Sequence, residues 1–122
     1  MKKNTLGQEG EAFAVGYLEN KGYRILAKNW RYRHLEVDII AQKYDFISIV
    51  EVKTRSTNYF GFPESFVDRK KMQNLVQAAD SYLQQNGLTD TGVRFEVIAL
   101  TKTPDGFEVE HIEDAFYAPL KR

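Results

Sequence analysis

The spacing of apolar residues along the chain predicts two helices and five strands. Apolar residues recur every three to four positions over residues 6–20, and Gly22 ends that helix. The same spacing over Asp68–Asn86 predicts a second helix, with its first residue as N-cap and Gly87 just beyond its end. Residues 54–67, which contain both glycine and proline, are expected to form a loop. Alternating or continuous apolar runs predict strands at Tyr23–Trp30, Leu35–Gln42, Phe46–Lys53, Val93–Leu100 and Phe107–Ile112.

Two neighbouring strands of this series differ in their expected burial. Phe46–Lys53 is almost continuously apolar, which is typical of a central strand covered on both faces. The other strand alternates, with Leu35, Val37, Ile39 and Ala41 on one face and Glu36, Asp38, Ile40 and Gln42 on the other. The element order αβββαββ predicts an α/β (α+β mixed) fold, in which helices flank a central mixed sheet.

Length and composition limit the class of protein. The 122 residues are 43% hydrophobic and 13% aromatic, which excludes intrinsic disorder and predicts a single domain over residues 1–122. The absence of cysteine excludes a disulfide framework and a cysteine-ligated metal site, and two histidines are too few for a histidine-rich one. There is no apolar run of membrane-spanning length and no apolar stretch of a signal peptide. We therefore expect a soluble cytoplasmic protein without a membrane partner.

Charge is balanced overall but unevenly distributed. The formal net charge is zero, which gives no global signal for nucleic-acid binding. The segment Asn20–Leu35 nevertheless carries five cations and no acid, with Tyr23, Trp30 and Tyr32 between them. This pattern fits a surface that binds phosphates and stacks bases, but on its own it better fits a solvated edge strand whose cations prevent aggregation. The cations are Lys21, Arg24, Lys28, Arg31 and Arg33.

Three charged residues lie within apolar strands, where an unused charge is costly. Glu51 and Lys53 are two positions apart and share one face of the central strand. A short connection at residues 44–45 predicts an antiparallel hairpin with the preceding strand, which places Asp38 opposite Glu51 and Glu36 opposite Lys53. Residues that face each other in this way have Cβ atoms about 5 Å apart.

Two carboxylates at that separation repel each other unless a cation lies between them. Mg²⁺ is commonly held by one or two carboxylates together with waters and phosphate oxygens. Lys53 would then orient or help deprotonate an attacking water, as in metal-assisted phosphodiester hydrolysis. The alternative is a set of cross-strand ion pairs, Glu36 with Lys53 and Glu51 with another cation. An acid-x-Lys triplet occurs three times in the chain, but only this one lies in an apolar strand beside another acid.

The two helices add further charged candidates. Glu11 falls within the apolar arc of the first helix and could face the site, whereas Glu9 falls outside it; the alternative is that both acids interact only with the helix dipole. The second helix begins with three cations, at residues 69–71. They would suit a bound phosphate, or they point to water with Asp68 and Glu64 as compensating acids.

Taken together, these residues resemble the YraN-like family of bacterial proteins, which are described as predicted endonucleases related to archaeal Holliday-junction resolvases. The resemblance runs from about Leu6 to Phe116 and is specific through the joint match. The matching motifs are Gly7-x-x-Gly10-Glu11, Asn29-Trp30-Arg31, Glu36-Val37-Asp38-Ile39-Ile40-Ala41, Val50-Glu51-Val52-Lys53-Thr54-Arg55, Phe60-Gly61, Val67 with Lys71 and Leu75, Arg94-Phe95-Glu96-Val97-Ile98 and Ile112-Glu113-Asp114-Ala115-Phe116.

This resemblance implies a restriction-endonuclease-like fold and an Asp…Glu-x-Lys nuclease centre. By motif position the catalytic residues are Asp38, Glu51 and Lys53, with Glu11 as a supporting acid. The metal is Mg²⁺ or Mn²⁺, and its ligands are Asp38 and Glu51. The chain departs from the family pattern at Leu35, where glycine is usual, and at Met72, where glutamine is usual.

The expected function is a metal-dependent endonuclease that acts on structured DNA. The alternatives are a non-catalytic nucleic-acid-binding module of the same fold and an interaction domain whose charges are structural. We expect the segment Lys21–Arg33 and the turn Arg69–Lys71 to flank one groove, and the sequence does not distinguish a monomer from a homodimer. The residues expected to contact nucleic acid are Lys28, Trp30, Arg31, Arg33, Arg55, Arg69, Lys70 and Lys71.

Overall fold

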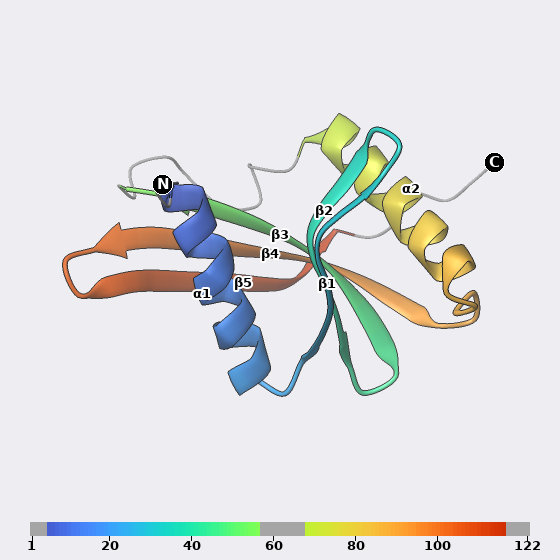
Figure 1. The fold of residues 1–122 in the computed structure, drawn as a ribbon, viewed down its shortest axis with the longest axis horizontal. Coiled ribbons are helices and arrows are strands. Elements are labelled where there is room, and N and C mark those ends of the chain that lie inside the picture. Colours follow the sequence, from blue (N-terminus) through green and yellow to red (C-terminus); the bar gives the residue numbers. More distant parts are fainter. Residues whose placement is uncertain (1–4, 57–67, 117–122) are drawn as a thin grey trace, which may run out of the picture.

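A helix packs on each face of a five-stranded sheet in the computed structural model of the protein, which describes residues 5–56 and 68–116 (Figure 1). The predicted order αβββαββ and the mixed α/β architecture are confirmed. Most of the expected loop, residues 57–67, lies outside the described residues, and β3 extends two residues further than expected. The elements are α1 (Leu6–Asn20), β1 (Arg24–Tyr32), β2 (Leu35–Lys43), β3 (Phe46–Arg55), α2 (Arg69–Gln85), β4 (Gly92–Thr103) and β5 (Gly106–Phe116).

The strands follow one another across the sheet in chain order, β1-β2-β3-β4-β5. All neighbouring pairs are antiparallel except β3 and β4, which run parallel. Because parallel neighbours need a long crossover, α2 occupies the connection between those two strands. None of the helices in the described part of the chain is long and apolar enough to cross a membrane.

The sheet buries a separate apolar cluster on each face. One face of β3 packs against α2 and the opposite face against α1, as expected for a central strand. The α2-side core contains Val37, Ile40, Ile47, Ile49, Leu75 and Val97 among others. The α1-side core contains Ala14, Leu18, Ile39, Val50, Val52 and Ile98 among others.

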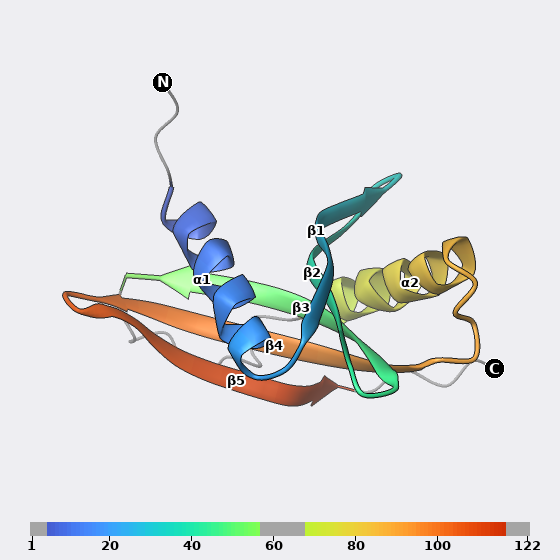
Figure 2. The same cartoon turned by 60° about the horizontal axis from the view of Figure 1, so that its bottom comes forward.

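Strand β2 changes face in its middle, which corrects the alternation predicted from the sequence. Leu35 and Val37 lie in the α2-side core together with Ile40, whereas Ile39 and Ala41 lie in the α1-side core. The physical reason is that β2 leaves β3 at this point. Its pairing with β3 ends at Ile39, while its pairing with β1 continues to Leu35. The outer part of the β1–β2 hairpin therefore turns away from the rest of the sheet (Figure 2).

Both helices begin as their sequences predict. The Thr5 hydroxyl accepts a hydrogen bond from the Gln8 N–H at 3.1 Å, and the Gln8 side chain accepts one from the Thr5 N–H at 2.9 Å. Asp68 caps α2 and accepts from the Lys71 N–H at 2.8 Å. The Asp68 cap fixes the first turn of α2, which carries Lys71.

Candidate active site

Asp38 and Glu51 lie where β2 separates from β3. The last backbone pair between the two strands is Ile39 with Val50, and the same register continued by one residue places Asp38 opposite Glu51. Beyond this pair the Asp38 Oδ2 accepts a hydrogen bond from the Val52 N–H at 2.8 Å. The Asp38 side chain thus replaces the backbone acceptor that the departing strand no longer supplies, and this bond fixes its position.

The expected pairing of Glu36 with Lys53 is wrong. Glu36 instead forms an ion pair with Arg31 of β1, with the two charged groups 2.7 Å apart. The cause is the same separation of strands, because β2 at this point is still paired with β1 but no longer with β3. Lys53 is consequently left to interact with Glu51, at 3.4 Å.

The Asp38 carboxyl has a raised pKa and is therefore partly protonated near neutral pH. Burial raises its pKa from 3.8 to about 7, and the negative charge of Glu51 is the second cause. The hydrogen bond from Val52 opposes this rise, and the charge of Glu11 adds to it. An added cation would offset the repulsion between these acids, so the local field favours cation binding.

Glu51 is almost completely buried, at 3% exposure, and only one of its carboxylate oxygens has partners among the described residues. Its Oε2 lies 3.4 Å from the Nζ of Lys53 and 3.4 Å from the Nζ of Lys71. Its Oε1 is buried and has no hydrogen-bond partner within residues 5–56 and 68–116. A buried acceptor without a partner is costly, which makes this oxygen a candidate ligand atom.

A second buried acid, Glu96 on β4, shows what a satisfied carboxylate in this sheet looks like. It is 1% exposed and accepts hydrogen bonds from Tyr23 Oη at 3.0 Å and from Ser48 Oγ, and it pairs with His111 Nε2 at 2.6 Å. All of these partners lie within the protein, which indicates a structural role. Glu51 differs because one of its oxygens has no partner within the part of the chain that the structure describes.

Sequence reasoning missed the role of Glu96, although a signal was present. Residues 95–98 form an apolar strand interrupted by one acid, which is the pattern that identified Glu51. In the parallel register Glu96 lies beside Val50, and Glu51 lies beside Val97. The two acids are therefore neighbours along the sheet but point to opposite faces.

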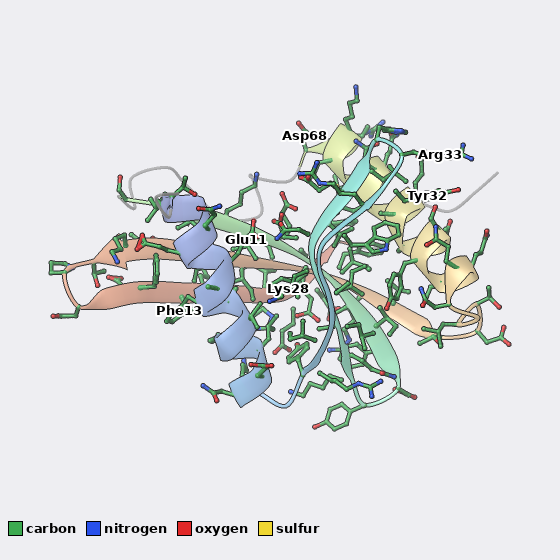
Figure 3. The ribbon with its side chains drawn as sticks, viewed as in Figure 1. Glu11, Phe13, Lys28, Tyr32, Arg33 and Asp68 are labelled. Carbon is green, nitrogen blue, oxygen red and sulfur yellow. The ribbon has the colours of Figure 1, made fainter. Side chains whose placement is uncertain are left out.

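Helix α1 brings Glu11 to the same site through a close contact with β3. A Cβ atom on Gly10 would lie 2.0 Å from Thr54 Oγ1, so the glycine permits the helix to pack directly on the strand. Glu11 is half-buried, and with Lys28 and Asp38 it borders a cavity of about 200 Å³ between α1 and the β1–β2 hairpin (Figure 3). Glu9 is exposed, as expected.

We expect Gly10→Ala to destabilise the protein by about 1–3 kcal/mol, because the added methyl group overlaps Thr54 on the central strand. Gly16→Ala is the matched control in the same helix. Its added methyl group would have no described atom within 4 Å, so this change should stabilise the protein by about 0.5–1 kcal/mol. Urea unfolding of both variants measures the difference. A Gly10→Ala protein as stable as the Gly16→Ala protein would contradict the close contact.

The donors at this site fit a magnesium-type ion. The part of the chain that the structure describes contains no group of three or more His, Cys, Asp or Glu side chains placed to hold a metal. Asp38 and Glu51 supply two carboxylates, and Mg²⁺ often takes only one or two and keeps several waters. The raised pKa of Asp38 is consistent with such an ion, and so is the Glu51 Oε1, for which the described residues supply no partner.

Residues 10–100 match the model of the uncharacterised protein family UPF0102. The chain belongs to the UPF0102 family. It is 47% identical over 120 residues to a UPF0102 protein of Parabacteroides distasonis, with 98% of each chain covered. It is 49% identical over 114 residues to UPF0102 protein FP2501 of Flavobacterium psychrophilum, with 93% of this chain and 95% of that protein covered. The resemblance to the YraN-like proteins is thereby confirmed.

Among solved structures, the UPF0102 chain is similar to Pyrococcus furiosus SfsA, whose structure was determined in complex with Ca²⁺. The TM-score is 0.40 and the sequence identity 14%. The match covers 87% of this chain and 62% of the SfsA chain, so it spans less than two thirds of that protein.

The cations of the segment Lys21–Arg33 lie at separate places, from the C-cap of α1 to the tip of the β1–β2 hairpin. Lys21 pairs with Glu113 at 3.8 Å, and Arg24 donates to Gln42 at 2.8 Å, at the start of β1. Arg33 is at the hairpin tip, beyond the far end of β1, which is nine residues or about 25–30 Å long. The tip overlaps the start of α2 in Figure 1 but stands clear of it in Figure 2.

Two residues that were expected to contact nucleic acid have other surroundings: Trp30 packs in the core, and Arg55 lies near acidic side chains. Trp30 is half-buried and packs edge-on against Tyr82 of α2, with ring centroids 5.8 Å apart, so it belongs to the α2-side core. Arg55 donates to Thr101 at 3.3 Å and borders a cavity with Glu108 and Glu110. These surroundings differ from the basic surface that the sequence predicts for both side chains.

Most of the remaining expected contacts are exposed cations, and two of the remaining lysines, exposed Lys28 and half-buried Lys71, lie next to the acids of the site. Arg31, Arg33, Arg69 and Lys70 are exposed, although Arg31 is paired with Glu36. Lys28 borders the cavity beside Asp38, and Lys71 faces Glu51.

The two departures from the YraN-like pattern lie in the helix–sheet core. Leu35 is 5% exposed and belongs to the α2-side core, and Met72 packs against the same cluster. Their side chains therefore fill the space between α2 and the sheet.

Proposed function

We propose that this UPF0102 protein is a divalent-metal-dependent endonuclease that hydrolyses phosphodiester bonds in nucleic acid, with structured DNA as the expected substrate. The observation that carries the proposal is the pair of half-buried Asp38 and buried Glu51, in which Glu51 keeps an oxygen without a partner among the described residues. The restriction-endonuclease-like fold that the family resemblance implies is compatible with the observed mixed sheet and its flanking helices.

In this proposal Asp38 and Glu51 hold Mg²⁺ or Mn²⁺. Such an ion, when bound, polarises a phosphoryl oxygen and lowers the pKa of a coordinated water. Lys53 shares a strand face with Glu51, and its side chain is 41% exposed, so its ammonium group reaches both the carboxylate and solvent. It is therefore suited to orient the attacking water or to stabilise the charge that develops on the phosphate. Glu11 acts on the site through the field that it adds at Asp38.

A non-catalytic nucleic-acid-binding module is the second candidate. It is favoured by the finding that the described residues hold no three-ligand metal cluster. In that case the exposed cations would bind phosphates, and the buried acids would have no ion to hold. The two candidates therefore differ in metal binding as well as in cleavage.

The experiment that tests the proposal incubates the purified protein with labelled four-way junction, flap and single-stranded DNA, with Mg²⁺, Mn²⁺ or EDTA. Metal-dependent cleavage of at least one substrate is the expected result. Calorimetric titration of Mn²⁺ into the wild type and Asp38→Ala is run in parallel, and only the wild type should bind. Salt-sensitive DNA binding without cleavage or metal binding would favour the binding module.

We expect nucleic acid to contact the exposed cations on both sides of the site. Arg33 is five residues from Asp38 on the departing hairpin, and Arg69 and Lys70 directly precede Lys71. Changing these three cations to glutamine should weaken DNA binding and reduce the slope of log K against log salt by roughly three.

The matched control changes Lys21, Arg24 and Lys102 to glutamine, since these changes also remove three positive charges but lie elsewhere, at the end of α1, the start of β1 and on β4. Binding is measured by fluorescence anisotropy across a salt series. Equal slopes for the two triple variants would show that the cations near the site do not meet phosphates.

A further inference from the structure

The first turn of α2 supplies a second lysine to the carboxylate of Glu51. The Nζ atoms of Lys53 and Lys71 each lie 3.4 Å from the same oxygen, Oε2. Lys53 comes from the strand that carries Glu51, whereas Lys71 reaches across from the helix. One oxygen of a buried acid therefore has two cationic partners, while the other oxygen has none among the described residues.

The position of Lys71 in its helix is unfavourable unless its charge is used. It is the third residue of α2, and its N–H is bound to the Asp68 cap at 2.8 Å, so its backbone is fixed in the first turn. A cation in this turn opposes the helix dipole. Its neighbours Arg69 and Lys70 are exposed to solvent, but the Lys71 side chain is only 33% exposed and turns inward to Glu51. At this position, the attraction between the Lys71 ammonium group and Glu51 offsets the unfavourable interaction of the lysine charge with the helix dipole.

The same contact places Lys71 in competition with any divalent ion at Glu51. An ion that binds this carboxylate adds two positive charges next to an ammonium group, and like charges at this range repel. Lys53 is tied to the site by its place on β3. Lys71 has a long, flexible side chain with partial access to solvent, so it is the lysine that can move away.

We propose that Lys71 is a positioning residue that holds Glu51 when the site lacks a divalent ion and turns to a nucleic-acid phosphate when the ion binds. This inference rests on the metal site of the proposed function. Lys71 lowers the affinity of the empty protein for the ion, and it raises the affinity for nucleic acid once the ion is bound. The binding of ion and nucleic acid is therefore coupled through one side chain.

The test titrates Mn²⁺ into the wild type, Lys71→Met, Lys71→Arg and Lys70→Met by calorimetry, without nucleic acid. We expect Lys71→Met to bind Mn²⁺ roughly tenfold more tightly than the wild type, because a competing charge is gone. Lys71→Arg should keep wild-type affinity, and Lys70→Met is the control for loss of one exposed charge in the same turn. A merely structural role would move the affinity the other way, since a disturbed site binds metal less well.

A second measurement follows the binding of labelled four-way junction DNA with and without Mg²⁺, with each protein also carrying Lys53→Ala to prevent cleavage. Mg²⁺ should strengthen DNA binding in the parent and in Lys102→Met, which removes an exposed lysine outside the expected nucleic-acid contacts, and by several-fold less in Lys71→Met. If the wild type binds Mn²⁺ but Lys71→Met binds no more tightly, the role of Lys71 is overturned and the metal site stands. If none of the proteins binds Mn²⁺, the proposed metal site fails and the role of Lys71 falls with it.

Discussion

Asp38→Asn should stabilise the protein at pH 8 and at the same time abolish metal binding. The pKa of Asp38 is raised from 3.8 to about 7, chiefly by burial and next by the charge of Glu51. Since the folded-state pKa lies above the unfolded value, the folded protein binds more protons between about pH 4 and pH 7. The free energy of unfolding therefore decreases as the pH rises through this window, by on the order of 2–4 kcal/mol.

Asparagine removes this dependence but keeps an oxygen that can accept the hydrogen bond from Val52. Urea unfolding at pH 5 and pH 8 should show that the wild type loses more stability over this range than Asp38→Asn. Glu9→Gln is the control, because Glu9 is an exposed acid on α1. Added Mg²⁺ should raise the melting temperature of the wild type and of Glu9→Gln but leave that of Asp38→Asn unchanged. An identical pH dependence in all three proteins would contradict the raised pKa.

Lys53→Ala should reduce DNA cleavage by about 10²–10³-fold while Mn²⁺ binding persists. Loss of one group that stabilises charge in a transition state typically has an effect of this size. Lys53 forms its ion pair with Glu51 at 3.4 Å and its side chain is 41% exposed, so the fold should tolerate its removal. Single-turnover cleavage with Mg²⁺ and calorimetry with Mn²⁺ measure the two properties separately.

Lys102→Ala is the matched control for this variant, since Lys102 is another exposed strand lysine and contacts the Phe107 ring. Its cleavage rate should equal that of the wild type. Cleavage that survives in both Lys53→Ala and Asp38→Ala would place the activity at another site or in a contaminant.

Much of the fold and the central acid pair could be predicted because both depend on local pattern. The boundaries of α1 and the N-cap of α2 follow from apolar spacing and capping residues, and the structure has both where expected. The register of Asp38 and Glu51 follows from the short hairpin turn, because an antiparallel pair is fixed once its turn is known. The face on which Ile40 is buried could not be predicted, because it depends on where β2 leaves β3.

The partners of the buried acids could not be predicted, because they come from distant parts of the chain. Glu96 is satisfied by residues of β3, β5 and the segment after α1, and no local pattern relates these to one another. Lys71 was expected to face a phosphate, and its contact with Glu51 depends on how α2 packs over β3. The same limit applies to Trp30, whose ring packs on α2 rather than forming an open stacking platform.

Where β2 separates from β3, the side chain at position 38 has two separate roles that each need an oxygen: it accepts the Val52 N–H, and it would hold the proposed ion. The Val52 N–H needs an acceptor whether or not any ion is present, and Asp38 provides it. A relative without a metal site would still need an oxygen-bearing side chain there to accept this hydrogen bond, and asparagine would suffice. The described contact of the Lys53 side chain is its ion pair with Glu51, and it does not replace a backbone acceptor of the sheet. If the proposed endonuclease function is right, relatives with lysine at position 53 should cleave nucleic acid, whereas relatives with aspartate at position 38 but no lysine at position 53 should keep only the fold.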